Sequence, residues 1–211
     1  MVGDSFAYAK EGLVGKWVKW ILLIISCIIF PLIMGYMVRI FKGAAPSPEL
    51  KEWGGLFIDG IKLFVVALIY AIPILILEYL ALGTAMATSM MSGNASAMMT
   101  AMAGAGVIAV LFFIVAVVIG LITATAYIRF ARTGSFGEAF NLNAIFAHIG
   151  KIGWVPYIIA LIIMVIILGI IEGICMLIPT VGIVILLIIL PFLVLFYSRY
   201  LAVLYDSAGA A

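Results

Sequence analysis

Two carboxylates stand out because each lies inside a strongly apolar stretch of the sequence. Glu78 lies in the apolar segment 63–82, and Glu172 lies in the apolar segment 154–178. A carboxylate is costly in hydrocarbon, so acidic residues within membrane segments are candidates for ion or proton binding. As a pair, Glu78 and Glu172 could bind a cation or relay protons. Both also lie within a turn or two of a segment end, where the simpler interpretation is a solvated carboxylate among lipid headgroups.

A second group of candidates is basic and flanks the apolar segments. It comprises Arg39, Lys62, Arg129, Arg132 and Arg199, with Lys151 close by in the sequence. Side chains of this kind near a membrane surface bind lipid phosphates or another anionic ligand. The alternative is that they only set the orientation of the segments, because positive residues next to membrane spans are retained in the cytoplasm.

The remaining candidates for chemistry are weaker. Thioethers suit Cu(I), and six methionines lie between residues 86 and 102, but this stretch has neither cysteine nor histidine. In the same stretch, Asn94-Ala-Ser96 is a glycosylation acceptor sequence. His148 is the only histidine, and we expect it to be a solvated residue at the membrane interface. We therefore predict no metal site and no cofactor.

No enzyme class is indicated. The sequence has no Gly-x-Ser-x-Gly, no His-Glu-x-x-His, no P-loop and no dinucleotide-binding fingerprint. Its formal net charge of +2 is too small to indicate nucleic-acid binding. We predict that the protein is not an enzyme and that it does not bind nucleic acid.

The amino-acid composition indicates which secondary structure carries these candidate residues. Of the 211 residues, 68% are hydrophobic and 9% are charged, whereas a soluble domain carries about 25% charged residues. The surplus of apolar side chains must face lipid, and long unbroken apolar runs indicate helices rather than the alternating strands of a barrel. We predict an all-α, polytopic transmembrane helix bundle forming a single integral membrane domain over residues 1–211.

About five membrane segments are expected, with two or three interfacial helices on the cytoplasmic side. The segments are 17–40, 63–82, 105–128, 154–178 and 183–205. Pro31 lies inside the first segment and predicts a kink or a break there. The interfacial helices are expected at 1–16, after a cap at Ser47 through residues 53–61, and after a Ser135–Glu138 capping box. The uncharged stretch 83–104 and the turn 179–182 are expected to connect spans.

The distribution of positive charge predicts that the first, third and fifth segments end in the cytoplasm. Lys10, Lys16 and Lys19 also favour a cytoplasmic N-terminus, and one crossing by the first segment cannot satisfy both ends. Either the N-terminus is outside, or Pro31 divides the first segment into a short re-entrant hairpin.

Two further patterns concern helix packing and duplication. Ala116, Gly120 and Ala124 recur at every fourth residue and predict a smooth face for close helix packing. The stretches 17–82 and 105–178 both read as a span, a surface helix and a second span, which indicates an internal repeat followed by a final span at 183–205. Plain anchoring by interfacial tyrosine and arginine would produce the same similarity.

Three short patterns resemble a known family. They are Gly35-Tyr36-x-x-Arg39, then Trp53-Gly54-x-Leu56-Phe57-x-Asp59-Gly60-x-Lys62, then Tyr70-x-x-Pro73. They are similar to an archaeal family of uncharacterised multi-pass membrane proteins, catalogued only as a domain of unknown function. The resemblance covers nearly the whole chain, although Lys51 interrupts the more acidic stretch that the family often has before the tryptophan. It implies an archaeal cell membrane and supplies no activity, substrate or catalytic residue.

Two functions remain after these exclusions. The first is a non-catalytic accessory or scaffolding component of the cell membrane, whose partners are the lipid bilayer and another membrane protein or a second copy of itself. The second is a small-solute or ion transporter or channel that uses Glu78 and Glu172. The prolines within the segments favour the second function, and the scarcity of polar residues at mid-membrane favours the first.

Overall fold

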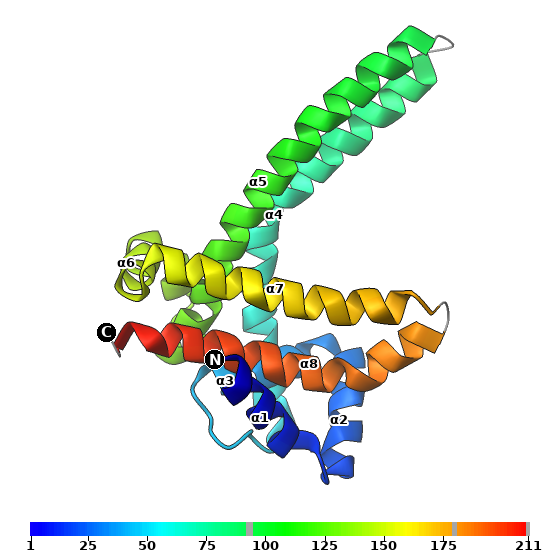
Figure 1. The fold of residues 1–211 in the computed structure, drawn as a ribbon. Helices are drawn as coiled ribbons and strands as arrows, with labels where there is room; N and C mark the ends of the chain where they lie inside the picture. The colour runs from blue at the N-terminus through cyan, green and yellow to red at the C-terminus, as the bar shows by residue number, and fades with distance from the viewer. Residues whose placement is uncertain (92–94, 179–180, 210–211) are drawn as a thin grey trace. The chain divides into compact units, whose positions relative to one another are not determined.

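The fold is all-α, as the sequence predicts. The computed structural model describes residues 1–91, 95–178 and 181–209, with the side chains of 82, 84–105 and 107 left out, and these residues form helices and no strand (Figure 1). The helices are α1 (Val2–Leu13), α2 (Trp17–Ile28), α3 (Phe30–Phe41), α4 (Trp53–Met91), α5 (Ala95–Thr133), the 3-10 helix η1 (Gly137–Phe140), α6 (Leu142–Ile152), α7 (Trp154–Met176), α8 (Val181–Asp206) and the 3-10 helix η2 (Ser207–Gly209).

Several of these helices are long and apolar enough to cross a membrane. Among the described residues, four qualify alone, namely Trp53–Ala81, Ile108–Thr133, Trp154–Met176 and Val181–Gly209. A fifth span arises if α2 and α3, which meet at an angle of 120°, together form one broken span. A helix needs about 20 apolar residues to span the hydrocarbon layer. This confirms the expected number of membrane segments and indicates a membrane-embedded protein.

The chain divides into two compact units, and the boundary falls within α4 and α5. Unit 1 contains residues 1–66 and 124–211, and unit 2 contains residues 67–123. In unit 1, α8 is the central helix, because it packs against α1, α2, α3 and α7. In unit 2, the two helical stretches from α4 and α5 run side by side (Figure 1).

Hydrogen bonds from side chains join the helices of unit 1. The Tyr200 hydroxyl on α8 donates to the Ala160 carbonyl on α7 at 2.8 Å. The Trp20 indole N–H on α2 donates to the Ile188 carbonyl on α8, also at 2.8 Å. Each hydrogen bond satisfies a polar group that would be costly to leave unpaired in an apolar environment. These contacts fix the positions of neighbouring helices as well as their separation.

Two backbones come very close where α3 crosses the start of α4. A Cβ atom on Gly35 would collide with the carbonyl of Leu56, and a Cβ atom on Gly60 would collide with the carbonyl of Pro31. Only glycine allows the two backbones to come this close. Gly35 and Gly60 belong to the patterns that carry the family resemblance, so the crossing gives those patterns a physical role.

The predicted first segment is broken, and the break lies at Ile29, two residues before Pro31. Pro31 is the second residue of α3, a position that tolerates the missing N–H of proline because no helical partner is available there anyway. The proline therefore begins a new helix. The sharp bend is that of a broken span or a re-entrant loop, so an outside N-terminus and a re-entrant hairpin, the two alternatives from the sequence, both stay open.

The helix start predicted at Ser47 is wrong. Residues 44–52 form no helix, and α4 begins at Trp53 and continues unbroken to Met91, so the expected surface helix 53–61 and the span 63–82 are one helix. Ser47 does not cap a helix because its hydroxyl accepts a hydrogen bond from the Lys19 ammonium. Glu52, with a positive φ of 57°, turns the chain just before α4.

The capping box predicted at Ser135 and Glu138 is also wrong. Glu138 accepts hydrogen bonds from Arg129 and Asn141 instead of capping a helix. The surface helix begins at Leu142, and the Asn141 side chain caps it by accepting from the backbone N–H of Ala144 at 3.2 Å. Asparagine is as good an N-cap as serine, so the correct signal lay six residues further along.

The stretch 83–104 is not a loop where the structure describes it. It is helical through Met91 and again from Ala95, because alanine and methionine are strong helix formers. Asn94, the predicted glycosylation acceptor, lies outside the described residues, and so do the side chains of the six methionines. Residues 179–180 of the predicted turn are also outside them, and α8 begins at Val181. The internal repeat stays a prediction.

The first interfacial helix is more deeply packed than the sequence predicts. Helix α1 covers residues that were expected to lie on the membrane surface, but it packs along α8. Ala9 and Leu13 are fully buried in this contact. Burial of apolar side chains at about 25 cal/mol per Å² makes α1 an integral part of unit 1.

Candidate functional site

All four arginines of the chain form ion pairs within unit 1. The pairs are Arg39 with Glu52, Arg129 with Glu138, Arg132 with Asp206, and Arg199 with Asp4. Lys42 forms a fifth pair, with Asp59 at 3.1 Å. These guanidinium groups therefore hold the protein together, and whether they also contact lipid headgroups stays a prediction. Lys62, the remaining member of the predicted basic group, has an exposed side chain.

Arg132 makes the most extensive of these contacts. Its Nε donates to the Phe41 carbonyl at 2.6 Å, and its Nη2 donates to both carboxylate oxygens of Asp206, at 2.9 and 2.8 Å. The Phe41 carbonyl belongs to the last turn of α3, whose carbonyl groups have no N–H donor within the helix. One side chain on α5 thus ties together the ends of α3 and α8.

Arg199 joins α8 to α1. Its Nε donates to Asp4 at 2.9 Å, and its guanidinium carbon lies 5.1 Å from the centre of the Tyr8 ring. Cations at this distance from an aromatic face are attracted by the ring. The contact combines an ion pair with a cation–π interaction, so Arg199 holds α1 in place.

Glu138 is ionised more readily than an ordinary glutamate. The hydrogen bond from Arg129, followed by that from Asn141, lowers the pKa of its carboxyl group. Hydrogen bonds to the charged form stabilise it. The pair fixes η1 against the end of α5 and is the reason why Glu138 does not act as a helix cap.

The predicted cation pair lies on two different units. Glu78 is an exposed residue of α4 in unit 2, and Glu172 is an exposed residue of α7 in unit 1. Their action as one ion or proton site stays a prediction. Among the described residues, no three side chains of histidine, cysteine, aspartate or glutamate gather as metal ligands would.

The small-residue face of α5 is open where it lies in unit 2. Gly120 is exposed, and nothing lies within 4 Å of the position that a Cβ atom would occupy. Ala116 is half-exposed, whereas Ala124, which belongs to unit 1, is buried. Packing of this face against another helix stays a prediction.

His148 differs from the solvated residue that the sequence predicts. Its ring stacks on Tyr205 with 3.7 Å between the ring centres, and its Nε2 lies 2.9 Å from the Tyr205 carbonyl. Burial lowers the pKa of His148, although the hydrogen bond to Tyr205 opposes this effect. The histidine therefore joins α6 to the end of α8.

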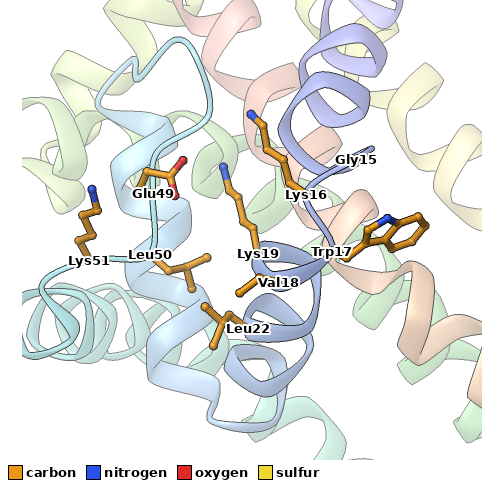
Figure 2. A pocket seen from close by; sticks show the side chains of 9 residues that line it. All are labelled: Gly15, Lys16, Trp17, Val18, Lys19, Leu22, Glu49, Leu50 and Lys51. Carbon is orange, nitrogen blue, oxygen red and sulfur yellow. The ribbon is translucent and has the colours of Figure 1, made fainter.

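A basic cavity lies at the start of α2, and sequence reasoning missed it. The cavity has a volume of about 420 Å³ and is lined by Gly15, Lys16, Trp17, Val18, Lys19, Leu22, Glu49, Leu50 and Lys51 (Figure 2). The signal was present in Lys16 and Lys19, which were considered only for membrane orientation. Lys51 lies on the segment between α3 and α4, and nothing local in the sequence indicates that this segment returns to α2.

Lys19 on α2 binds the segment 44–52 that connects α3 and α4. Its side chain is buried, and its ammonium donates to the Ser47 hydroxyl at 2.7 Å and to the Ser47 carbonyl at 3.2 Å. The ammonium also lies 6.0 Å from the centre of the Tyr36 ring, and the Tyr36 hydroxyl donates to the Pro48 carbonyl at 2.9 Å. The cavity wall formed by residues 49–51 is thus held by contacts with α2 and α3.

The same segment is held on its other side by α1. The Tyr8 hydroxyl donates to the Ala44 carbonyl at 2.8 Å. Burial raises the pKa of Tyr8 to about 12, so the hydroxyl keeps its proton and remains a donor at neutral pH. A Cβ atom on Gly12 would lie 2.6 Å from the Ser47 hydroxyl oxygen, so α1 approaches this segment closely.

The fold and the charge distribution define a helical membrane-embedded protein. The family model of a protein of unknown function (DUF4013) matches residues 20–180, and the chain therefore belongs to this family. This confirms the predicted resemblance to a domain of unknown function. No curated protein and no solved structure matches the chain. The matched range includes Glu49 and Lys51 of the cavity and begins just after Lys19.

Proposed function

We propose that this protein is a non-catalytic accessory or scaffolding component of the cell membrane that crosses the bilayer several times. The observation that supports this function is the use of the arginines as structural ties. Each arginine pairs with a carboxylate of the same chain. Guanidinium groups engaged in this way stabilise a fixed arrangement of helices, which is what a scaffold requires.

The exposed face of α7 provides a surface for other membrane components. It consists of branched apolar side chains, namely Val155, Ile159, Ile162, Val165, Ile166, Ile170 and Ile174. Helices associate in membranes through van der Waals packing, without a hydrophobic driving force between them. Lipid tails fit this face too, so a protein partner must be identified by experiment. The archaeal membrane implied by the resemblance stays a prediction.

The experiment is native mass spectrometry of the protein after gentle extraction from its own membrane. We expect a stoichiometric complex with another membrane protein. Gly120→Leu is expected to weaken this complex, because it places a large side chain on the small-residue face of α5, where nothing lies within 4 Å of the Cβ position. Val118→Leu, at an exposed position on the other side of the same helix, is the control and should leave the complex intact.

A lone protein that carries a bound ion or solute would contradict the scaffold and favour the transporter. In that case Glu78→Gln combined with Glu172→Gln would abolish the stabilisation by cations in detergent. A scaffold has no such requirement, so its melting temperature should respond to cations equally with and without these two substitutions.

A further inference from the structure

We propose that the basic cavity at the start of α2 binds a phosphate-bearing anion, supplied by a phospholipid headgroup or by free phosphate. Three amino groups, those of Lys16, Lys19 and Lys51, surround it, and Glu49 is the one acidic side chain in its lining (Figure 2). The lining thus has a formal excess of two positive charges. An excess of this size in one cavity matches the charge of a phosphate group.

The lysines of the cavity are not consumed by the ion pairs of the chain. Among the described residues, those pairs involve the four arginines and Lys42. Lys16 and Lys51 are exposed, so their amino groups are accessible to an anion. The arginines stabilise the fold through their ion pairs, whereas Lys16 and Lys51 line an open space. Their amino groups are therefore available to a ligand.

Lys19 supplies a fixed donor in the cavity. An ammonium group has three N–H donors, and the Ser47 hydroxyl and carbonyl take two of them. The third remains for a ligand. Because the side chain is buried and already held in place, little conformational entropy is lost when an anion binds to it.

The remaining walls suit a phosphate that is attached to an apolar molecule. Val18, Leu22 and Leu50 contribute apolar surface, and Trp17, the first residue of α2, is 68% exposed. The Trp17 ring stacks on Trp20 with 5.8 Å between the ring centres. Tryptophan is enriched at the level of lipid headgroups, where a phosphate lies next to its acyl chains.

The test uses the purified full-length protein in a neutral detergent, titrated with phosphatidylglycerol and, in a parallel arm, with inorganic phosphate. Native mass spectrometry counts the bound lipid, and the melting temperature reports stabilisation by phosphate. We expect Lys16→Gln combined with Lys51→Gln to weaken binding about twentyfold, since each lysine near an anionic headgroup contributes several-fold in affinity. Both positions are exposed, so the substitutions should leave the fold intact.

The matched control is Lys10→Gln combined with Lys151→Gln, which removes two exposed lysines outside the cavity lining. Loss of binding in the cavity variant alone would support the site, and equal loss in both variants would overturn it. Binding of phosphatidylglycerol without stabilisation by inorganic phosphate would identify a lipid headgroup as the source. Stabilisation by both would identify any phosphate group as sufficient. Absence of both effects in the unmodified protein would overturn the proposal.

Discussion

The two compact units of the chain differ in how charge is used. All charged residues except Glu78 lie in unit 1, where ion pairs connect α8 with α1 and α5, and a hydrogen bond from Arg132 connects α5 with α3. Unit 2 has Glu78 alone, on an exposed position. Ion pairs and hydrogen bonds are directional, whereas apolar packing between helices depends on shape. The ion pairs of unit 1 are therefore specified by particular partners, whereas the described helices of unit 2 carry a single charged residue.

The largest effect is expected from glycine substitutions that compare the two units. Gly35→Ala should lower the free energy of unfolding by about 2 kcal/mol or more, because the added Cβ collides with the Leu56 carbonyl. Gly120→Ala, in unit 2, should be neutral or raise it by up to about 1 kcal/mol, because the site is open and alanine favours helix. Thermal unfolding in detergent measures both. Equal stability of the two variants would show that the α3–α4 crossing is looser than described.

A smaller effect is expected from the loss of one directional tie. Arg132→Gln should lower the free energy of unfolding by about 1–2 kcal/mol, because it removes a hydrogen bond to Phe41 and an ion pair to the half-exposed Asp206. Lys62→Gln, at an exposed residue of unit 1, is the control and should change stability by less than about 0.5 kcal/mol.

A double-mutant cycle with Asp206→Asn separates the ion pair from the hydrogen bond to Phe41. Coupling above about 0.5 kcal/mol is expected, since the two side chains are in direct contact. Additive effects would mean that the Phe41 contact alone carries the contribution of Arg132, and the ion pair would then be no part of what specifies unit 1.

The smallest effect concerns pH and is confined to unit 1. Burial holds the pKa of His148 below 6.5 in the folded protein, whereas the unfolded chain titrates near 6.5. The neutral form is thus favoured by folding, so its contribution to stability is complete above pH 6.5 and is lost as the pH falls through the folded pKa. We expect the melting temperature to decrease on acidification in this range, and His148→Phe should flatten this dependence.

Proton NMR offers a direct check, because His148 is the only histidine and its ring signals can be titrated without ambiguity. A midpoint at or above 6.5 would contradict the partial burial against Tyr205. With such a midpoint, the stability of unit 1 would not decrease on acidification through His148.

The apolar spans were predictable from sequence because hydropathy is summed over many residues. The predicted segment 154–178 corresponds to α7 at Trp154–Met176, and 183–205 corresponds to α8 at Val181–Asp206. A single misjudged residue has little influence on such a sum. The break near Pro31 was predictable for a similar reason, because the constraint that proline imposes is local to the backbone.

The polar contacts were not predictable, because each depends on a partner far along the chain. The Ser47 hydroxyl is taken by Lys19, which lies 28 residues away, and the local capping pattern carries no information about this competition. Similarly, Glu138 accepts a hydrogen bond from Arg129 and does not cap a helix. The basic cavity was missed because Lys51 reaches it only through the path of residues 44–52. The helical residues 83–91 and 95–104 were missed for a different reason, since small uncharged residues were interpreted as a connection between spans despite the helix propensity of alanine and methionine.

The ties made by α8 have a consequence for the order of biosynthesis. Arg199 is synthesised 195 residues after its partner Asp4, and Asp206 is synthesised 74 residues after Arg132. Helices α1 and α5 therefore leave the ribosome before the charges on α8 that pair with them exist, and α1 lacks the helix against which it packs. The contacts of α1 and α5 with α8 form only after α8 has been synthesised, so these helices are held less firmly until then.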